Sequence, residues 1–202
     1  MRLGCHPFRM QRLLASVFIV GLLAGCGSGS DEEAVGSTIE IPMGFAGVES
    51  AGPPVELPDG IQEIVVDAVD AYVRDGIVAT LRTGEPERLD DVFDTAALAS
   101  LETESGAALL DRGVPEATGD LTAVAEPVIV VGLADGAGVI VLVSAHVDLE
   151  VVATTDEGEL RITRVGDLTF APAGDTWRIT AFSMLVARDG AGIEETAEAV
   201  AP

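Results

Sequence analysis

The chain has 202 residues, of which 48% are hydrophobic, and its formal net charge is -23 at pH 7. All 11 basic residues are arginine, and they stand against 34 acidic residues. Such a balance repels phosphate and anionic lipid headgroups, which argues against nucleic-acid binding and against a membrane contact made by a basic patch.

The first residues have the order of a secretory signal peptide. Arg2, Arg9 and Arg12 precede an apolar run over residues 13–23, and small residues then lead to Cys26. The run supplies about half of the roughly 20 apolar residues that a membrane-spanning helix needs. We therefore expect a cleaved signal rather than a retained membrane helix.

Residues 23–26, Leu-Ala-Gly-Cys, resemble the lipobox of bacterial lipoproteins. The resemblance implies that residues 1–25 are removed, whether translation starts at Met1 or Met10. It also implies that Cys26 becomes the N-terminus and carries fatty acyl chains such as palmitate. The protein would then be lipid-anchored in the cell membrane and face outside the cytoplasm.

Few reactive groups remain after that processing. Cys5 leaves with the signal and Cys26 carries the lipid, so the exported chain has neither a disulfide nor a free thiol. It must fold on its hydrophobic core alone, and one domain of about 130 residues is large enough for that. The absence of lysine, together with abundant Ala, Gly, Val, Asp and Arg, resembles the composition of actinobacterial proteins.

Residues 26–55 are predicted to form a flexible, acidic tether. They are rich in Gly, Ser and Pro, and no basic residue occurs from Gly27 through Val73. Their few apolar residues are isolated and show no period. One alternative stays open, in which a short segment around residues 39–45 docks on the domain.

The domain is predicted over residues 56–188 and opens with a long helix. This helix is expected to begin at Asp59, with Gln62 completing a capping box, and to end at Gly84. Its apolar residues recur at helical spacing; they are Ile61, Ile64, Val65, Ala68, Tyr72, Val73 and Leu81.

Two further helical stretches are expected before the strands. A short one follows Pro86, and another begins at Asp94 or Thr95 and runs to about Arg112. Gly106 is predicted to break the latter, because glycine is a poor helix former.

Four β-rich runs follow, over residues 121–131, 139–152, 159–170 and 176–187. The segments between them are short and rich in turn residues, which favours antiparallel hairpins in a meander. Pro127 predicts that the first strand lies at an edge or carries a bulge. Residues 189–202 are rich in Gly, Ala and Glu and are predicted to be a disordered tail.

Alternation in the second and third runs places apolar side chains on one face of the sheet and polar ones on the other. The turn Thr155–Gly158 leaves two registers open. One puts His146 opposite Asp167, and the other puts Glu150 opposite Arg161. In both, the outer face is charged, so we expect a monomer.

These elements predict an α+β fold in which N-terminal helices pack on a curved antiparallel sheet of about four strands. The run from Phe170 to Ile179, a turn followed by Trp177-Arg-Ile, resembles the closing hairpin of nuclear transport factor 2-like domains, the SnoaL-like and cystatin-like group. The resemblance implies a cone in which the first helix and the sheet enclose a pocket. Tyr72, Phe93 and Trp177 are the large side chains able to line it, and core packing is the alternative for each.

The sequence contains few residues that could form a catalytic or metal site. His146 is the only histidine left after processing, which excludes a two-histidine metal site, and alternation places it on the polar sheet face. Without lysine there is neither a P-loop nor a Schiff base. No Gly-x-Ser-x-Gly elbow occurs in the domain. We expect no catalytic residue, no metal and no cofactor.

The sequence therefore predicts a lipid-anchored, non-catalytic binding or interaction module of the cell envelope. Its partner would be another envelope protein or a small apolar ligand held in the cone. One alternative is a SnoaL-like pocket enzyme with His146 as its base, although SnoaL-like enzymes hold such groups inside the cone. The other is a lipid-carrier lipoprotein, which would need a larger apolar cavity than these elements provide.

Overall fold

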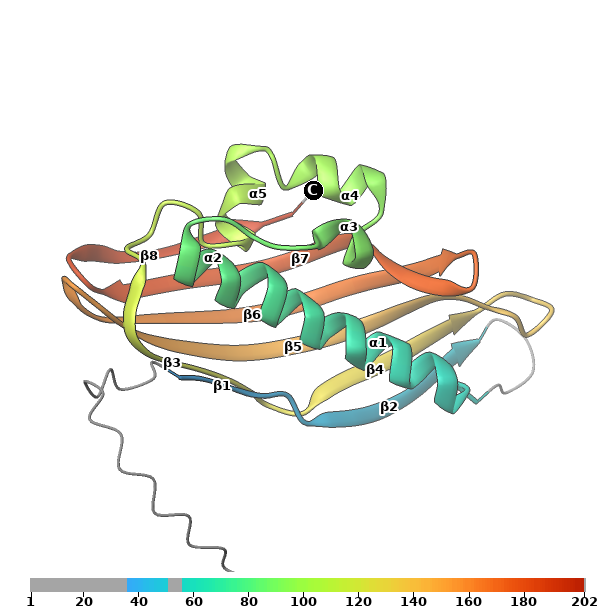
Figure 1. Ribbon diagram of the computed structural model, residues 1–202. Coiled ribbons are helices and arrows are strands. Elements are labelled where there is room, and N and C mark those ends of the chain that lie inside the picture. Colours follow the sequence, from blue (N-terminus) through green and yellow to red (C-terminus); the bar gives the residue numbers. More distant parts are fainter. Residues whose placement is uncertain (1–35, 51–55, 202) are drawn as a thin grey trace, which may run out of the picture. The chain divides into compact units, whose positions relative to one another are not determined.

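The structure is a computed structural model that describes residues 36–50 and 56–201. Within these ranges eight strands form one mixed sheet, and helices cover one of its faces (Figure 1). The strands are β1 Ser37–Glu40, β2 Met43–Ser50, β3 Ala117–Ala125, β4 Val128–Ala134, β5 Ile140–Thr155, β6 Gly158–Ala173, β7 Thr176–Gly190 and β8 Ile193–Val200. The helical segments are α1 Asp59–Ala71, the π-helical η1 Tyr72–Val78, α2 Ala79–Thr83, α3 Leu89–Val92, α4 Thr95–Ser100 and α5 Glu104–Leu109.

The sheet has the strand order β1-β3-β5-β6-β7-β8. β3 and β4 follow one another along β5, both antiparallel to it. Pro127 lies between them, where its missing N–H would interrupt a ladder. β1 runs parallel to β3, and β2 runs parallel to β4, so these two short strands extend the sheet at that edge.

The predicted fold class is wrong. The described part of the chain is mostly sheet with few helices, and the sheet is mixed and eight-stranded where an antiparallel sheet of about four strands was expected. The sheet has more strands than predicted because it includes segments that precede and follow the predicted domain, residues 56–188. β1 and β2 precede the first helix, and β8 follows the last predicted strand.

Residues 37–50 belong to the predicted tether, yet they form β1 and β2. Ile39 is partly buried against the core. Arg82 of α2 donates a hydrogen bond to Ser37 Oγ over 3.1 Å and so joins β1 to the helical layer. A flexible tether is therefore wrong for these residues, and docking of the segment around residues 39–45 is the better description.

The predicted disordered tail is likewise wrong for most of its length. Residues 193–200 form β8, which pairs antiparallel with β7. Val200 is 1% exposed and contributes to the core. Gly190 and Gly192 both have positive φ, at 89° and 75°, and they form the turn that brings β8 back along β7.

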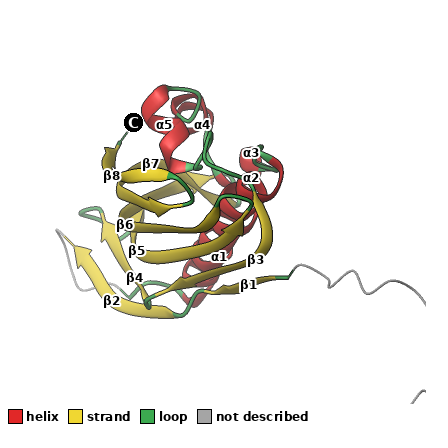
Figure 2. Cartoon of the chain, turned by 90° about the vertical axis from the view of Figure 1, so that its left-hand side faces the viewer, coloured by secondary structure: helices red, strands yellow, loops and turns green. Residues whose placement is uncertain are grey.

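α1, η1 and α2 form one long helical segment that lies on the concave side of the curved sheet (Figure 2). The predicted bounds are confirmed, since α1 begins at Asp59 and Gly84 ends α2 with φ 78°. The predicted capping box is absent. Instead, the Gln62 side-chain amide donates to the carbonyl of Leu57 over 2.9 Å.

The later helices are short and capped by side chains. Asp94 Oδ1 accepts the N–H of Ala97 over 2.7 Å at the start of α4. Thr103 Oγ1 accepts the N–H of Gly106 over 3.0 Å at the start of α5. The predicted break at Gly106 therefore falls before it, at residues 101–103, and Gly106 lies inside α5.

The first of the two predicted registers is confirmed, because His146 lies opposite Asp167. Arg161 instead reaches Glu150 diagonally, with 2.7 Å between Nη1 and Oε1. A bulge in β7 leaves Thr180 without a pairing partner in β6. Before the bulge the odd-numbered residues Trp177 and Ile179 are buried, and after it the even-numbered residues Phe182, Met184 and Val186 are buried.

Within residues 36–50 and 56–201, no helix is both long and apolar enough to cross a bilayer. The predicted signal peptide, residues 1–25, and Cys26 lie outside the described residues.

Candidate functional site

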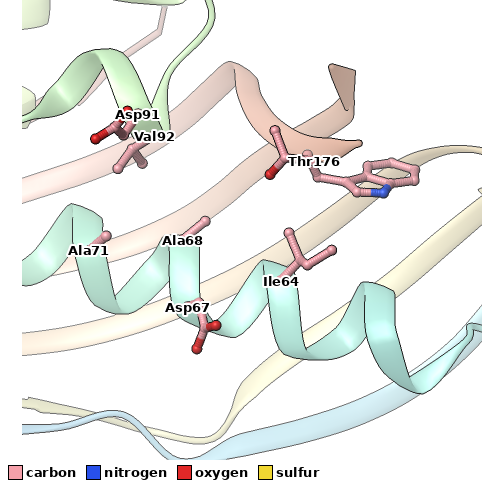
Figure 3. Close-up of a pocket in the computed structure, with 8 residues that line it drawn as sticks. Ile64, Asp67, Ala68, Ala71, Asp91, Val92 and Thr176 are labelled. Atoms are coloured by element: carbon pink, nitrogen blue, oxygen red, sulfur yellow. The ribbon is translucent and has the colours of Figure 1, made fainter. Parts of the chain in front are cut away.

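A groove lies beside α1, where α3 and the start of β7 approach it (Figure 3). Its volume is about 250 Å³. Figure 3 shows Ile64 and Ala68 on the side of α1 that faces Thr176, whereas Asp67 points away. The lining residues are mostly apolar and none is basic; they are Ile64, Asp67, Ala68, Ala71, Asp91, Val92, Thr176 and Trp177.

The structure separates the three aromatic residues that were expected to line one pocket. Trp177 lines the groove and is 9% exposed. Tyr72 and Phe93 lie in the core, 0% and 1% exposed, with their rings edge to face and centroids 5.9 Å apart. Phe93 makes a second edge contact with Phe182 at 6.5 Å. Tyr72, Phe93 and Phe182 therefore pack in the hydrophobic core, which was the alternative to lining a pocket for Tyr72 and Phe93.

His146 lies on the outer face of the sheet, as the alternation predicted. Its Nδ1 is 3.2 Å from Asp167 Oδ1, and both side chains are about half exposed, at 47% and 53%. Ser183 lies opposite Asp167 on the next strand. Aspartate therefore stands between the histidine and the serine, whereas a nucleophilic triad needs the histidine in the middle. Apolar side chains such as Val165 and Leu185 are also exposed on this face.

Sequence reasoning missed a cluster of charged side chains inside the core. Arg164 of β6 is 0% exposed and forms an ion pair with Asp111, whose side chain is equally buried. Arg188 of β7 reaches the same carboxylate, with 3.0 Å between its Nε and Asp111 Oδ1. Arg164 also donates to the carbonyl of Leu109 over 2.6 Å, and the Tyr72 hydroxyl donates to that carbonyl over 3.1 Å.

Burial governs the protonation of this cluster. It raises the pKa of Tyr72, an effect that the neighbouring Arg164 charge opposes, so the phenol is neutral at pH 7. Burial also lowers the pKa of Arg164 and of Arg188. Two guanidinium groups thus share one carboxylate, and the nearby charge of Glu198 opposes the lowering of the Arg188 pKa.

The sequence contains a signal for part of this cluster. Arg164 has the same parity as Leu160, Ile162 and Leu168, which alternation had already placed inward. Asp111 gives no such signal, because it lies in a turn where its φ is 56°. Arg188 faces inward only because the bulge in β7 turns the even-numbered residues that follow it toward the core.

No protein-family model matches the chain, and searches of curated proteins and of solved structures found no match. In the part of the chain that the structure describes, no three His, Cys, Asp or Glu side chains gather as metal ligands would. The described residues thus define a curved mixed-sheet domain with a large hydrophobic core and cavities that open at its surface.

Proposed function

We propose that this protein is a lipid-anchored, non-catalytic binding module outside the cytoplasm, and that it holds a small apolar ligand in the groove beside Trp177. The apolar lining of the groove, with Ile64, Ala68 and Val92 beside the indole, carries this proposal. Apolar walls favour an apolar ligand through burial of its surface. No basic residue is present to attract an anion.

The placement of the reactive side chains supports a non-catalytic role. His146 and Ser183 stand on either side of Asp167 on the outer sheet face, in the wrong order for a triad. The buried carboxylate of Asp111 is occupied by two arginines. The groove contains neither histidine nor arginine.

The anchor part of the proposal rests on the lipobox-like sequence that ends at Cys26. Cys26→Ala should release the protein from the membrane fraction, because no acyl chain can then be attached. Retention of that variant in the membrane would contradict the anchor.

The ligand part is tested with protein purified from its native membrane. Bound small molecules are extracted and identified by mass spectrometry, and the wild type is compared with Ala68→Leu, which fills the groove. Ala99→Leu is the matched control, because Ala99 is exposed on α4 and lies outside the groove. A small apolar compound should accompany the wild type and the control but not Ala68→Leu. An extract that is empty, or equal for all three proteins, would overturn the proposal.

A further inference from the structure

A second cavity lies between α5 and β8, away from Trp177. Its volume is about 370 Å³, and two of its lining side chains, Arg112 and Arg188, are arginines. The full lining is Ala107, Ala108, Arg112, Gly113, Val114, Arg188, Ile193 and Glu198. We propose that this cavity binds a small organic carboxylate with a short apolar tail.

One arginine of the cavity has a hydrogen-bond donor that the protein does not use. The side chain of Arg188 is about nine-tenths buried, and its Nε and Nη2 bind Asp111. Arg112 Nε is buried and has no partner among the described residues, whereas its Nη1 and Nη2 lie 3.4 Å from Glu102 Oε1. A buried donor without an acceptor is costly, so an oxygen ligand at this place would stabilise the protein.

The charges around the cavity favour an anion. Arg188 belongs to the cluster in which two buried guanidinium groups share the single carboxylate of Asp111. Glu198 also lines the cavity. It forms no ion pair with Arg188 in the described part of the chain, but its charge opposes the lowering of the Arg188 pKa by burial and so offsets part of the positive charge. A ligand carboxylate would be attracted by Arg112 and Arg188 and repelled by Glu198 alone among the lining residues.

The shape and lining of the cavity favour a carboxylate over a bare anion. The planar fork of an arginine matches the two oxygens of a carboxylate. The other walls include Ala107, Val114 and Ile193, which would lie against an alkyl tail. Inorganic phosphate would leave these apolar surfaces uncovered.

The probe for this site is sodium hexanoate, added at constant ionic strength to the full chain without its lipid and followed by protein NMR. 1-Hexanol and inorganic phosphate are the comparison probes. Hexanoate should bind at least about tenfold more tightly than either of them, because it alone has both the carboxylate and the tail. Equal affinity of hexanol or of phosphate for this cavity, read from the NMR signals of its lining residues such as Gly113, would overturn the proposal.

Variants locate the binding. Arg112→Gln should weaken hexanoate binding about tenfold, which corresponds to one charge-assisted hydrogen bond. Arg161→Gln removes the same charge from the outer sheet face and should change the affinity less than about twofold. Glu198→Gln should strengthen binding about threefold, because a like charge is removed.

The unfolding temperature of each variant is measured alongside, so that a loss of binding is not confused with a loss of structure. If folded Arg112→Gln binds as the wild type does, or if Glu198→Gln weakens binding, the site is not the one proposed. The indole N–H signal of Trp177 should stay in place throughout, since the groove is a separate site. Movement of that signal with the same affinity would assign hexanoate to the groove and overturn the proposal.

Discussion

Arg164 and Asp111 form an ion pair in which neither side chain is exposed to solvent. One residue comes from the middle of β6 and the other from the turn after α5. Arg164 also binds the carbonyl of Leu109, so this single side chain fixes the end of α5 to the sheet. The pair therefore links the two layers of the domain at a point where the core would otherwise be apolar.

Asp111→Asn should destabilise the protein by about 3–5 kcal/mol, because it leaves two buried guanidinium groups without a counter-charge. Asparagine tolerates the positive φ of this position, so the backbone conformation is not the cause. Chemical denaturation measures the effect. Asp148→Asn, on the exposed outer face of β5, is the control and should stay within about 0.5 kcal/mol. Similar values for the two variants would contradict a buried pair.

Tyr72 is the only tyrosine of the chain, so the ultraviolet absorbance of tyrosinate reports on it alone. Burial raises its pKa in the folded state, whereas the unfolded chain releases this proton at about pH 10. Above that pH the unfolded state binds fewer protons, and the free energy of unfolding falls as the pH rises. Tyrosinate should therefore appear only as the protein unfolds. Ionisation near pH 10 with the fold intact would contradict this.

Gly166→Ala tests the close approach of β6 and β7. A Cβ at this position would lie 2.0 Å from the carbonyl oxygen of Ser183 and 2.7 Å from the Cα of Met184. Because main-chain atoms cannot move aside without distorting the sheet, we expect the free energy of unfolding to fall by about 1–3 kcal/mol, measured by thermal or chemical denaturation. Gly136→Ala is the matched control, because nothing lies within 4 Å of its Cβ. Equal stability of both variants would show that the strands are not so close.

Removal of β1 and β2 should destabilise the domain. A chain that starts at Pro54 exposes the edge formed by β3 and β4 and loses the contact of Arg82 with Ser37. We expect its unfolding temperature to fall by about 5 °C or more relative to a chain that starts at Ala34. If the segment were a flexible tether, the two chains would have the same unfolding temperature. Equal unfolding temperatures would therefore contradict a stabilising role of β1 and β2.

Local patterns predicted the elements that depend on neighbours in sequence. The helix from Asp59 to Gly84 and the pairing of His146 with Asp167 follow from periodicity and from a short turn. β1 and β2 could not be predicted in the same way. β1 is only four residues long and β2 contains two glycines, and both are strands because they pair with the distant β3 and β4.

The candidate sites were predictable only in part. Trp177 was singled out by size and position, and the structure places it beside a groove, while its role in binding stays a prediction. Tyr72 and Phe93 have the same chemistry but pack on one another in the core, a distinction set by three-dimensional contacts alone. The burial of Arg164 was not predicted, because only the apolar residues of this strand were assigned to the inner face. Its partner Asp111 lies in a turn, where alternation gives no indication of burial.

The most direct test of the proposed function is an NMR titration of the single indole N–H signal, that of Trp177, with cyclohexanol. A small neutral ligand in this groove should shift the signal with saturation, at a dissociation constant of about 1 mM, as expected for so few atoms. Saturable binding should persist in Ala99→Leu and vanish in Ala68→Leu. A shift that never saturates, or one that is unchanged when Ala68→Leu fills the groove, would contradict the assignment of this groove as the binding site.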